Sequence, residues 1–260
     1  MVAEPLTYVY AISRGQDANL ASELEGIAGS TVRWVEVAGL SALVSDVAED
    51  EFGESALRRN LEDLDWLGEA VRDHNRVVEA AASVLPVAPM GFATVYYSDR
   101  RVRECLADRA DRFETVLDRV TGRTEWGVKA YADISAGQPG SSEPRGERPG
   151  AAYLQRLRRR EESREQAKEE ALHHAAEVHA SLVELAEEST AHPPQSRELA
   201  GYDGVMVLNG AYLVDDTRES SFKEKLRELA HGHPKFRFEL TGPWPPYSFA
   251  TILEDEQEQR

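Results

Sequence analysis

The order of strand-like and helix-like hydrophobic patterns constrains the fold of this chain more than any other feature. In its first half, β-branched and aromatic runs alternate with segments that have helical spacing. We expect strands over 6–12, 31–37 and 40–47, helices over 17–25 and 57–85, an extended run over 87–97 and a helix over 99–120. Pro86 is expected to end the long second helix. This order is βαββαβ, which is typical of a ferredoxin-like domain.

The same order recurs in the second half of the chain. We expect a strand over 125–134, a helix over 153–188, strands over 203–208 and 211–214, a helix over 220–230 and a closing strand over 235–240. Asn209-Gly210 predicts a tight hairpin turn between the third and fourth of these elements. The sequence therefore predicts an α+β protein with two ferredoxin-like domains, over residues 1–122 and 123–260.

Three segments fall outside this regular pattern. Residues 137–150 are rich in Gly, Pro and Ser and are expected to form a linker, residues 254–260 form an acidic tail, and the acidic residues 49–51 are expected in a loop. The helix over 153–188 is highly charged in its first half and carries an apolar stripe only in its second half. We expect this helix to project in part, either as a solvated surface helix or as a partner-binding arm.

Charge and composition restrict the class of function. The formal net charge of −17 repels phosphate backbones and anionic lipids, and the basic run Arg158–Arg160 is followed at once by Glu161 and Glu162. No signal peptide and no run of about 20 apolar residues is found. The single cysteine, Cys105, cannot form an internal disulfide. We therefore expect a cytoplasmic protein that binds neither nucleic acid nor membrane.

Motifs that carry enzymatic chemistry are missing from the sequence. There is no phosphate-binding glycine loop, nucleophile elbow, zinc-protease motif or cysteine pair. Glu170 with His173, and Glu228 with His231, have the Glu-x-x-His spacing of di-iron bundles, but such sites need carboxylates from two further helices. His74 lies on the apolar face of its helix, where a core or interface histidine is expected. The sequence predicts no catalytic residue, no metal and no cofactor.

A proline-rich run near the C-terminus, Thr-Gly-Pro-Trp-Pro-Pro-Tyr-Ser-Phe over residues 241–249, is the most distinctive segment. Its three prolines fix backbone angles and remove three N–H donors, so the chain is expected to be stiff and extended. Trp244, Tyr247 and Phe249 then project from a segment that loses little entropy on binding. These aromatic side chains either cap the core of the protein itself or form a docking surface.

This run resembles the hallmark of the gas vesicle protein GvpF/GvpL family, and shorter stretches agree with it along nearly the whole chain. These stretches are residues 8–10, 74–78, 87–95, 125–131, 208–214 and 222–229. The stretch over 87–95 is similar to the Pro-x-x-Phe-x-Thr strand of the family, although Gly91 and Ala93 stand where Arg and Gly are expected.

The resemblance implies a non-enzymatic accessory or minor structural protein of gas vesicle assembly. Family members are expected to contact the hydrophobic shell protein and other gas vesicle accessory proteins during nucleation or shell formation, at the gas vesicle in the cytoplasm. We assign the protein contact to the C-terminal run and the family strand: Pro243, Trp244, Pro245, Pro246, Tyr247, Phe249, Pro89 and Phe92. The alternative is a ferredoxin-like regulatory protein that binds a ligand or metal, and an enzyme that uses the Glu/His pairs is a third possibility.

Overall fold

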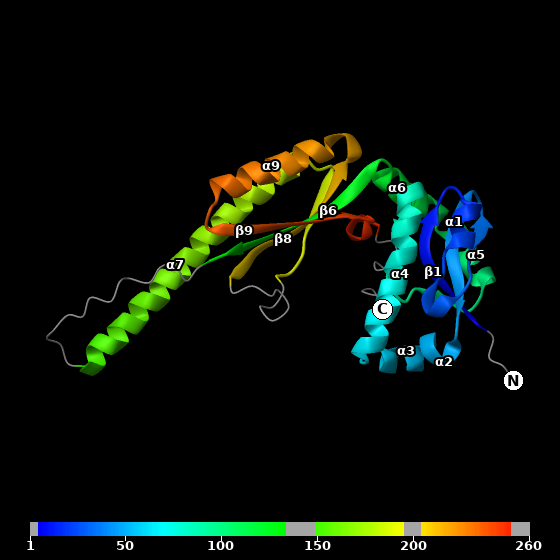
Figure 1. The fold of residues 1–260 in the computed structure, drawn as a ribbon, viewed down its shortest axis with the longest axis horizontal. Coiled ribbons are helices and arrows are strands. Elements are labelled where there is room, and N and C mark those ends of the chain that lie inside the picture. The colour runs from blue at the N-terminus through cyan, green and yellow to red at the C-terminus, as the bar shows by residue number, and fades with distance from the viewer. Residues whose placement is uncertain (1–4, 134–148, 195–203, 251–260) are drawn as a thin grey trace. The chain divides into compact units, whose positions relative to one another are not determined.

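The protein is described by a computed structural model that covers residues 5–133, 149–194 and 204–250 (Figure 1). The described residues form two compact units. The first unit contains the chain up to Glu125 together with the segment that begins at Pro243, and the second unit runs from Trp126 to Gly242. The acidic tail over 254–260 and most of the expected linker over 137–150 lie outside the described residues, but Pro149 and Gly150, expected in the linker, begin a helix.

The first unit is built on one sheet of five strands. Its strands are β1 (Leu6–Ser13), β2 (Val32–Val37), β3 (Leu40–Val47), β4 (Ala88–Pro89) and β5 (Val95–Tyr96). The order across the sheet is β2-β3-β1-β4, and β5 also pairs with β1. The β2–β3 hairpin turns at Ala38 and Gly39, both with positive φ, which matches the right-handed twist of its strands.

Helices cover both faces of this sheet, and β1 is therefore buried along its whole length. The helices are α1 (Ala18–Glu23), α2 (Glu49–Phe52), α3 (Glu54–Asn60), α4 (Leu64–Val84), α5 (Asp99–Asp108) and α6 (Ala110–Val120). Val9 and Ile12 pack in the same apolar cluster as residues of α5 and α6. Tyr8 and Tyr10 pack in a second cluster with residues of α1, α2 and α4. Two apolar layers therefore stabilise the first unit.

Within the described residues, the second unit has a four-stranded sheet packed against two helices. Its elements are β6 (Arg123–Ala132), α7 (Pro149–Val183), β7 (Glu188–Ala191), β8 (Val205–Asp215), α9 (Glu219–Gly232) and β9 (Phe236–Trp244), and the strand order is β7-β8-β6-β9. Trp126 and Val128 of β6 share one apolar cluster with Leu182 of α7 and with Phe222 and Leu226 of α9. The border between the units falls inside β6 and β9.

Helix α7 divides into an exposed half and a docked half, as the charge pattern predicted. From Tyr153 to Glu170 no described side chain is buried. From Ala171 onward, Ala171, Ala175, Val178 and Leu182 are buried at three- and four-residue spacing and form the face that packs on the sheet. The helix ends at Val183, earlier than expected, and β7 follows it.

Two long helices expected in the first unit are interrupted. The expected helix over 57–85 is divided at residues 61–63, because the Asp63 side chain accepts hydrogen bonds from the N–H groups of Asp65 and Trp66 and starts α4 there. The expected helix over 99–120 breaks at Arg109, whose φ of −120° and ψ of 20° are not helical. Residues 49–51, expected in a loop, begin α2.

The hairpin predicted at Asn209-Gly210 is wrong. Both residues lie inside the continuous strand β8, and the hairpin partner of β8 is β7, with Ala191 opposite Gly210. A Cβ atom at position 210 would lie 2.9 Å from the Tyr212 ring, so the glycine makes room for that ring. Asn209 instead holds the end of β7, since its Nδ2 donates to the Pro193 carbonyl at 3.0 Å.

The α+β fold class is confirmed by the two sheets and their helices. The two units differ from the expected division at two places, and the smaller difference is a first border after Glu125 instead of after residue 122. Residues from Pro243 onward were expected to belong with the second half, but they pack in the first unit. The physical reason is that the last described residues bury apolar side chains against α4 and α6, as the site geometry below shows.

Candidate protein-interaction site

The C-terminal run leaves the sheet of the second unit and becomes part of the first. Strand β9 ends at Trp244, Pro245 and Pro246 follow, and residues Tyr247–Phe249 form a single 3-10 turn. Proline nitrogen atoms cannot donate to a ladder, and this accounts for the end of the strand at this point. Pro245 and Pro246 are buried, so this part of the run serves the packing of the protein itself.

Polar contacts fix the 3-10 turn on the first unit. The backbone N–H and the hydroxyl of Ser248 donate to the two carboxylate oxygens of Glu125, at 2.8 and 2.7 Å. The Tyr247 hydroxyl donates to Oδ1 of Asn75 at 3.2 Å, and Arg119 donates to the Phe249 carbonyl at 3.3 Å. The turn is therefore held by α4, by α6 and by the start of β6.

Of the aromatic residues expected to form the contact, only Trp244 is exposed. Its exposed fraction is 45%, whereas Phe249 is 3% exposed and Tyr247 is half-buried against the apolar cluster of α4. Pro243 is also exposed. The aromatic run thus divides into an exposed dipeptide, Pro243-Trp244, and a buried part that anchors it.

The two predicted site segments meet at His74. Pro89 is buried in β4 opposite Ala11 of β1. Phe92 is half-buried, and its ring centre lies 5.9 Å from that of His74. The Tyr247 ring centre lies 6.1 Å from His74 on the same cluster. The structure therefore brings Phe92 and Tyr247 around one histidine that the sequence predicted only as a core or interface residue.

His74 is buried and electrically neutral. Its Nδ1 lies 2.9 Å from the Tyr8 hydroxyl, which also accepts a hydrogen bond from the Ala93 N–H at 2.9 Å. Burial lowers the pKa of His74 to about 4. The Met90 backbone opposes this shift in pKa by a smaller amount. Burial also raises the pKa of Tyr8 and of Tyr247, so the aromatic groups around His74 stay uncharged at neutral pH.

The remaining histidines have other neighbours than metal ligands among the described residues. In the part of the chain that the structure describes, no group of three His, Cys, Asp or Glu side chains is placed to hold a metal ion. His173 and His174 instead approach Glu177, at 3.6 and 3.0 Å, and His231 donates to the Arg227 carbonyl at 2.8 Å. The Glu-x-x-His pairs of the sequence are thus not joined by further ligands in the described residues.

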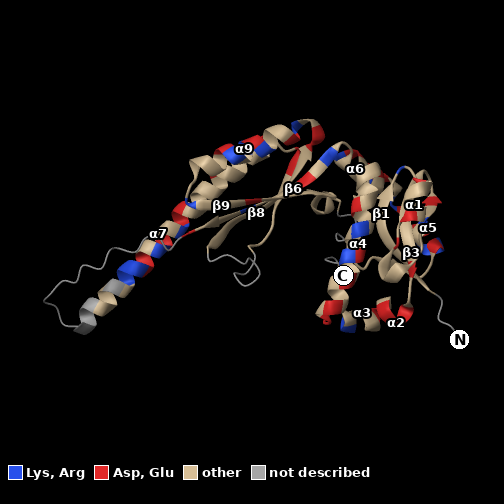
Figure 2. Cartoon of the chain, in the orientation of Figure 1, with Lys and Arg blue, Asp and Glu red and all other residues tan. Residues whose placement is uncertain are grey.

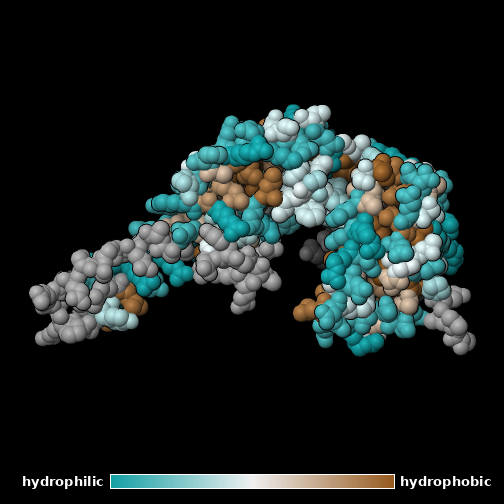
Figure 3. Space-filling view, viewed as in Figure 1, coloured by the Kyte–Doolittle hydropathy of each residue, from teal (hydrophilic) through white to brown (hydrophobic). Residues whose placement is uncertain are grey.

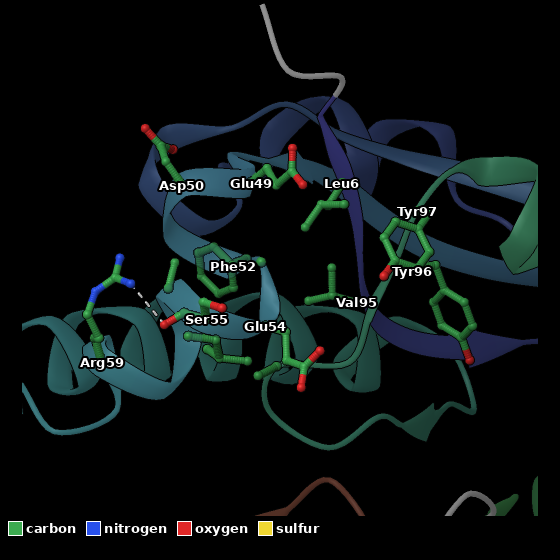
Figure 4. A pocket seen from close by; sticks show the side chains of 14 residues that line it. Leu6, Glu49, Asp50, Phe52, Glu54, Ser55, Arg59, Val95, Tyr96 and Tyr97 are labelled. Atoms are coloured by element: carbon green, nitrogen blue, oxygen red, sulfur yellow. Dashed lines mark hydrogen bonds between the residues drawn. The ribbon is translucent and has the colours of Figure 1, made fainter.

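A pocket of about 600 Å³ opens between α2, α3 and the strand pair β1–β5 (Figure 4). Figure 4 shows Phe52, Leu6 and Val95 facing the hollow, with Asp50 and Arg59 at its margin. Sequence reasoning missed this pocket, because its walls come from residues 6, 49–59 and 93–97, which are distant along the chain. The acidic run over 49–51 was the one local sequence feature that could have indicated this pocket.

No helix among the described residues is both long and apolar enough to cross a membrane.

Comparison with known proteins assigns the chain to a family. Residues 6–251 match the family described as "Gas vesicle synthesis protein GvpL/GvpF". The chain is 41% identical over 259 residues to gas vesicle protein L of a Streptomyces strain, covering 98% of this chain and 97% of that relative. It is 25% identical over 264 residues to gas vesicle protein F2 of Halobacterium salinarum, covering 100% and 99% of the two chains.

Solved structures support the fold. The crystal structure of gas vesicle protein GvpF from Anabaena superimposes with a TM-score of 0.69 at 20% identity and covers 96% of this chain and 97% of that one. The crystal structure of GvpF from Microcystis aeruginosa gives a TM-score of 0.65 at 18% identity, with coverage of 97% and 100%. At these identities the likeness concerns the fold, whereas the sequence matches concern the family. This chain belongs to the GvpL/GvpF family of gas vesicle synthesis proteins.

Proposed function

We propose that this protein is a non-enzymatic accessory or minor structural component of gas vesicle assembly. In this proposal it binds the hydrophobic shell protein and other accessory proteins in the cytoplasm during nucleation or shell formation. The observation that carries the proposal is the family match, which extends over residues 6–251 and includes the proline-rich run. A shell subunit exposes apolar surface before it assembles, and a strongly acidic partner with net charge −17 would keep the pair in solution.

The contact is proposed to centre on Trp244 and Pro243. Trp244 combines a large apolar surface with a backbone that is held in place before binding, because Ser248 and Tyr247 are fixed a few residues later. In this proposal the buried or half-buried residues stabilise the packing of the protein itself and need not touch the partner, and these are Pro245, Pro246, Tyr247, Phe249, Pro89 and Phe92. The burial of these side chains thus narrows the proposed contact from the whole set of predicted site residues to Pro243 and Trp244.

Two ferredoxin-like units are proposed as the scaffold. The sheet of the first unit has the order β2-β3-β1-β4, and that of the second unit has the order β7-β8-β6-β9. If the strands of each unit are numbered from 1 in chain order, both sheets have the order 2-3-1-4. In the second unit the elements β6, α7, β7, β8, α9 and β9 follow one another as βαββαβ. These two orders support the proposal.

The test is a pull-down of purified shell protein by the Trp244→Ala variant of the full chain. Trp244 is 45% exposed, so the variant is expected to stay folded while capture of the shell protein falls about tenfold. The Trp244→Phe variant keeps an aromatic surface and is expected to retain most of the capture. If the alanine variant captures as much shell protein as the wild type, this contact is rejected.

A further inference from the structure

The α2–α3 groove, defined as the pocket lined by Leu6, α2, α3 and residues 93–97, has an apolar floor and an acidic rim. Phe52 and Leu6 are 3% and 6% exposed, and Val95 and Tyr96 extend this apolar lining. The volume of about 600 Å³ lies in the range typical of ligand pockets. The groove can therefore bury a small group of apolar side chains from a partner.

The rim of the groove carries unbalanced negative charge. Three carboxylates line it, those of Glu49, Asp50 and Glu54, and one guanidinium, that of Arg59. Glu54 pairs with Arg58 at 2.8 Å, and Arg59 is turned toward the Ser55 carbonyl of its own helix at 3.1 Å. No ion pair of Glu49 or Asp50 occurs within the described ranges. An occupant of this groove should be apolar at its centre and basic at its edge.

The described start of α7 has that composition. Tyr153, Leu154 and Leu157 are exposed by 58%, 60% and 48%. At about 100° per residue they lie within about 100° of one another around the helix axis and form one apolar face. Figure 3 shows apolar atoms at the surface where the described part of α7 begins.

Basic residues flank this apolar face, and the exposed Glu161, about 80° from Tyr153 around the axis, ends the face at the next turn. Arg160 lies within about 20° of Tyr153 around the axis, and Arg158 within about 40° of Leu154. Both arginines are exposed. Figure 2 shows the blue of Lys and Arg on this end of α7 and the red of Asp and Glu on α2 and α3. We call residues 153–160 the α7 arm.

We propose that the α7 arm of one copy of this chain docks into the α2–α3 groove of a second copy. The chain carries both halves of a complementary pair, an apolar face edged by arginine and an apolar pocket edged by carboxylates. Because arm and groove are different surfaces, each copy offers one arm and one groove to other copies.

The strength of this contact is limited by its size and by the charge of the whole chain. An arm of eight residues buries far less area than a standard stable interface, so the association should be weak and concentration-dependent. Two copies with net charge −17 repel each other at long range. At about 0.15 M salt the Debye length is about 8 Å, so that repulsion is largely screened while contacts at the groove persist.

The experiment is a charge exchange between purified full-length variants, followed by analytical ultracentrifugation at about 0.15 M salt. The wild type is expected to show a weight-average mass that rises with concentration up to about 1 mM. A groove variant, Glu49→Arg with Asp50→Arg, and an arm variant, Arg158→Glu with Arg160→Glu, should each lose this self-association about tenfold or more. In each variant, arm and groove have the same sign of charge.

Mixing the two variants distinguishes the proposed contact from a general effect of charge. The acidic arm of one variant fits the basic groove of the other, and the remaining arm and groove are unchanged, so the mixture should regain association. Matched controls reverse exposed charges elsewhere, Arg100 and Arg101 to Glu or Asp108 and Asp111 to Arg, and should associate as the wild type does. These readouts need no gas vesicle partner, so they stand apart from the proposed function.

Three results would overturn the proposal. The first is a wild-type chain that stays monomeric over the whole concentration range. The second is self-association of the groove or arm variant at the wild-type level. The third is a mixture that associates no better than either variant alone while circular dichroism shows both to be folded.

Discussion

At the scale of single residues, the neutral His74 shows how the environment sets the chemistry of a side chain. The imidazole is 1% exposed, lies among the rings of Tyr8, Tyr10, Phe92 and Tyr247, and receives its only described side-chain hydrogen bond through Tyr8. Protonation would place a positive charge in this apolar cluster. The residue therefore couples the stability of the first unit to pH.

The first prediction concerns this coupling. The pKa of His74 is about 4 in the folded protein and about 6.5 in the unfolded chain, so between these values the unfolded state binds the additional proton. Above pH 6.5, the titration of His74 leaves the free energy of unfolding unchanged. As the pH falls from 6.5 to 4, this titration lowers the free energy of unfolding, and below pH 4 it lowers it no further. Between pH 7 and pH 4, the free energy of unfolding measured with urea should fall by about 3 kcal/mol less in His74→Gln than in the wild type.

The control for this prediction is His173→Gln, because the His173 side chain is 75% exposed and lies on the α7 surface. It should keep the pH dependence of the wild type. If His74→Gln and the wild type lose stability in parallel from pH 7 to pH 4, His74 does not titrate as described.

At the scale of elements, capping side chains decided where helices begin. The apolar spacing from Leu57 to Leu85 continues across residues 61–63, and it predicted one helix. The Asp63 side chain satisfies two N–H groups at the start of α4, and Leu61 and Leu64 are exposed by 42% and 80%. The capping hydrogen bonds can therefore start a new helix within an apolar pattern of helical spacing, because the apolar side chains next to the break are exposed.

The second prediction tests this cap. Asp63→Ala removes the acceptor for the N–H groups of Asp65 and Trp66 and should lower the free energy of unfolding by about 1 kcal/mol, measured by urea denaturation. Asp63→Asn keeps an acceptor oxygen and should recover most of the loss. Glu62→Ala is the control, since Glu62 precedes the cap, and equal losses in Glu62→Ala and Asp63→Ala would contradict the assignment.

At the scale of the whole molecule, the first unit is built from two parts of the chain that the second unit separates. Residues 5–125 form most of it, and the segment after Gly242 returns to complete it. Phe249 is 3% exposed, and Ala250 belongs to the same apolar cluster as Phe113 and Val116 of α6. The first unit is therefore complete only when residues 243–250 pack on it.

The third prediction follows from this closure. Phe249→Ala should destabilise the first unit by about 3–5 kcal/mol and speed amide hydrogen exchange in α4 and α6, with little change in α9 of the second unit. Trp244→Ala is the matched control, because its side chain is 45% exposed and should cost less than about 1 kcal/mol. Unchanged exchange in α6 of Phe249→Ala would show that the segment does not stabilise the first unit.

Local patterns recovered much of this structure, and non-local contacts account for what they missed. The strands of the first unit and the α+β class followed from alternation and helical spacing. The hairpin prediction at Asn209-Gly210 failed because turn propensity is local, whereas the pairing of β8 with β7 and the space required by Tyr212 come from the tertiary structure. The proline-rich run was found as a segment, but burial had to separate Trp244 from Tyr247 and Phe249.

The sequence alone determined the strands of the first unit, the strong negative charge and, through the proline-rich run, the family of the protein. Only the tertiary structure decided that this run packs in the first unit, that His74 lies between Phe92 and Tyr247, and that residues 6, 49–59 and 93–97 line one groove. The physical reason is that periodicity reports which face of an element is buried. The side chains that cover this face come from distant parts of the chain, and their identity depends on how the elements pack.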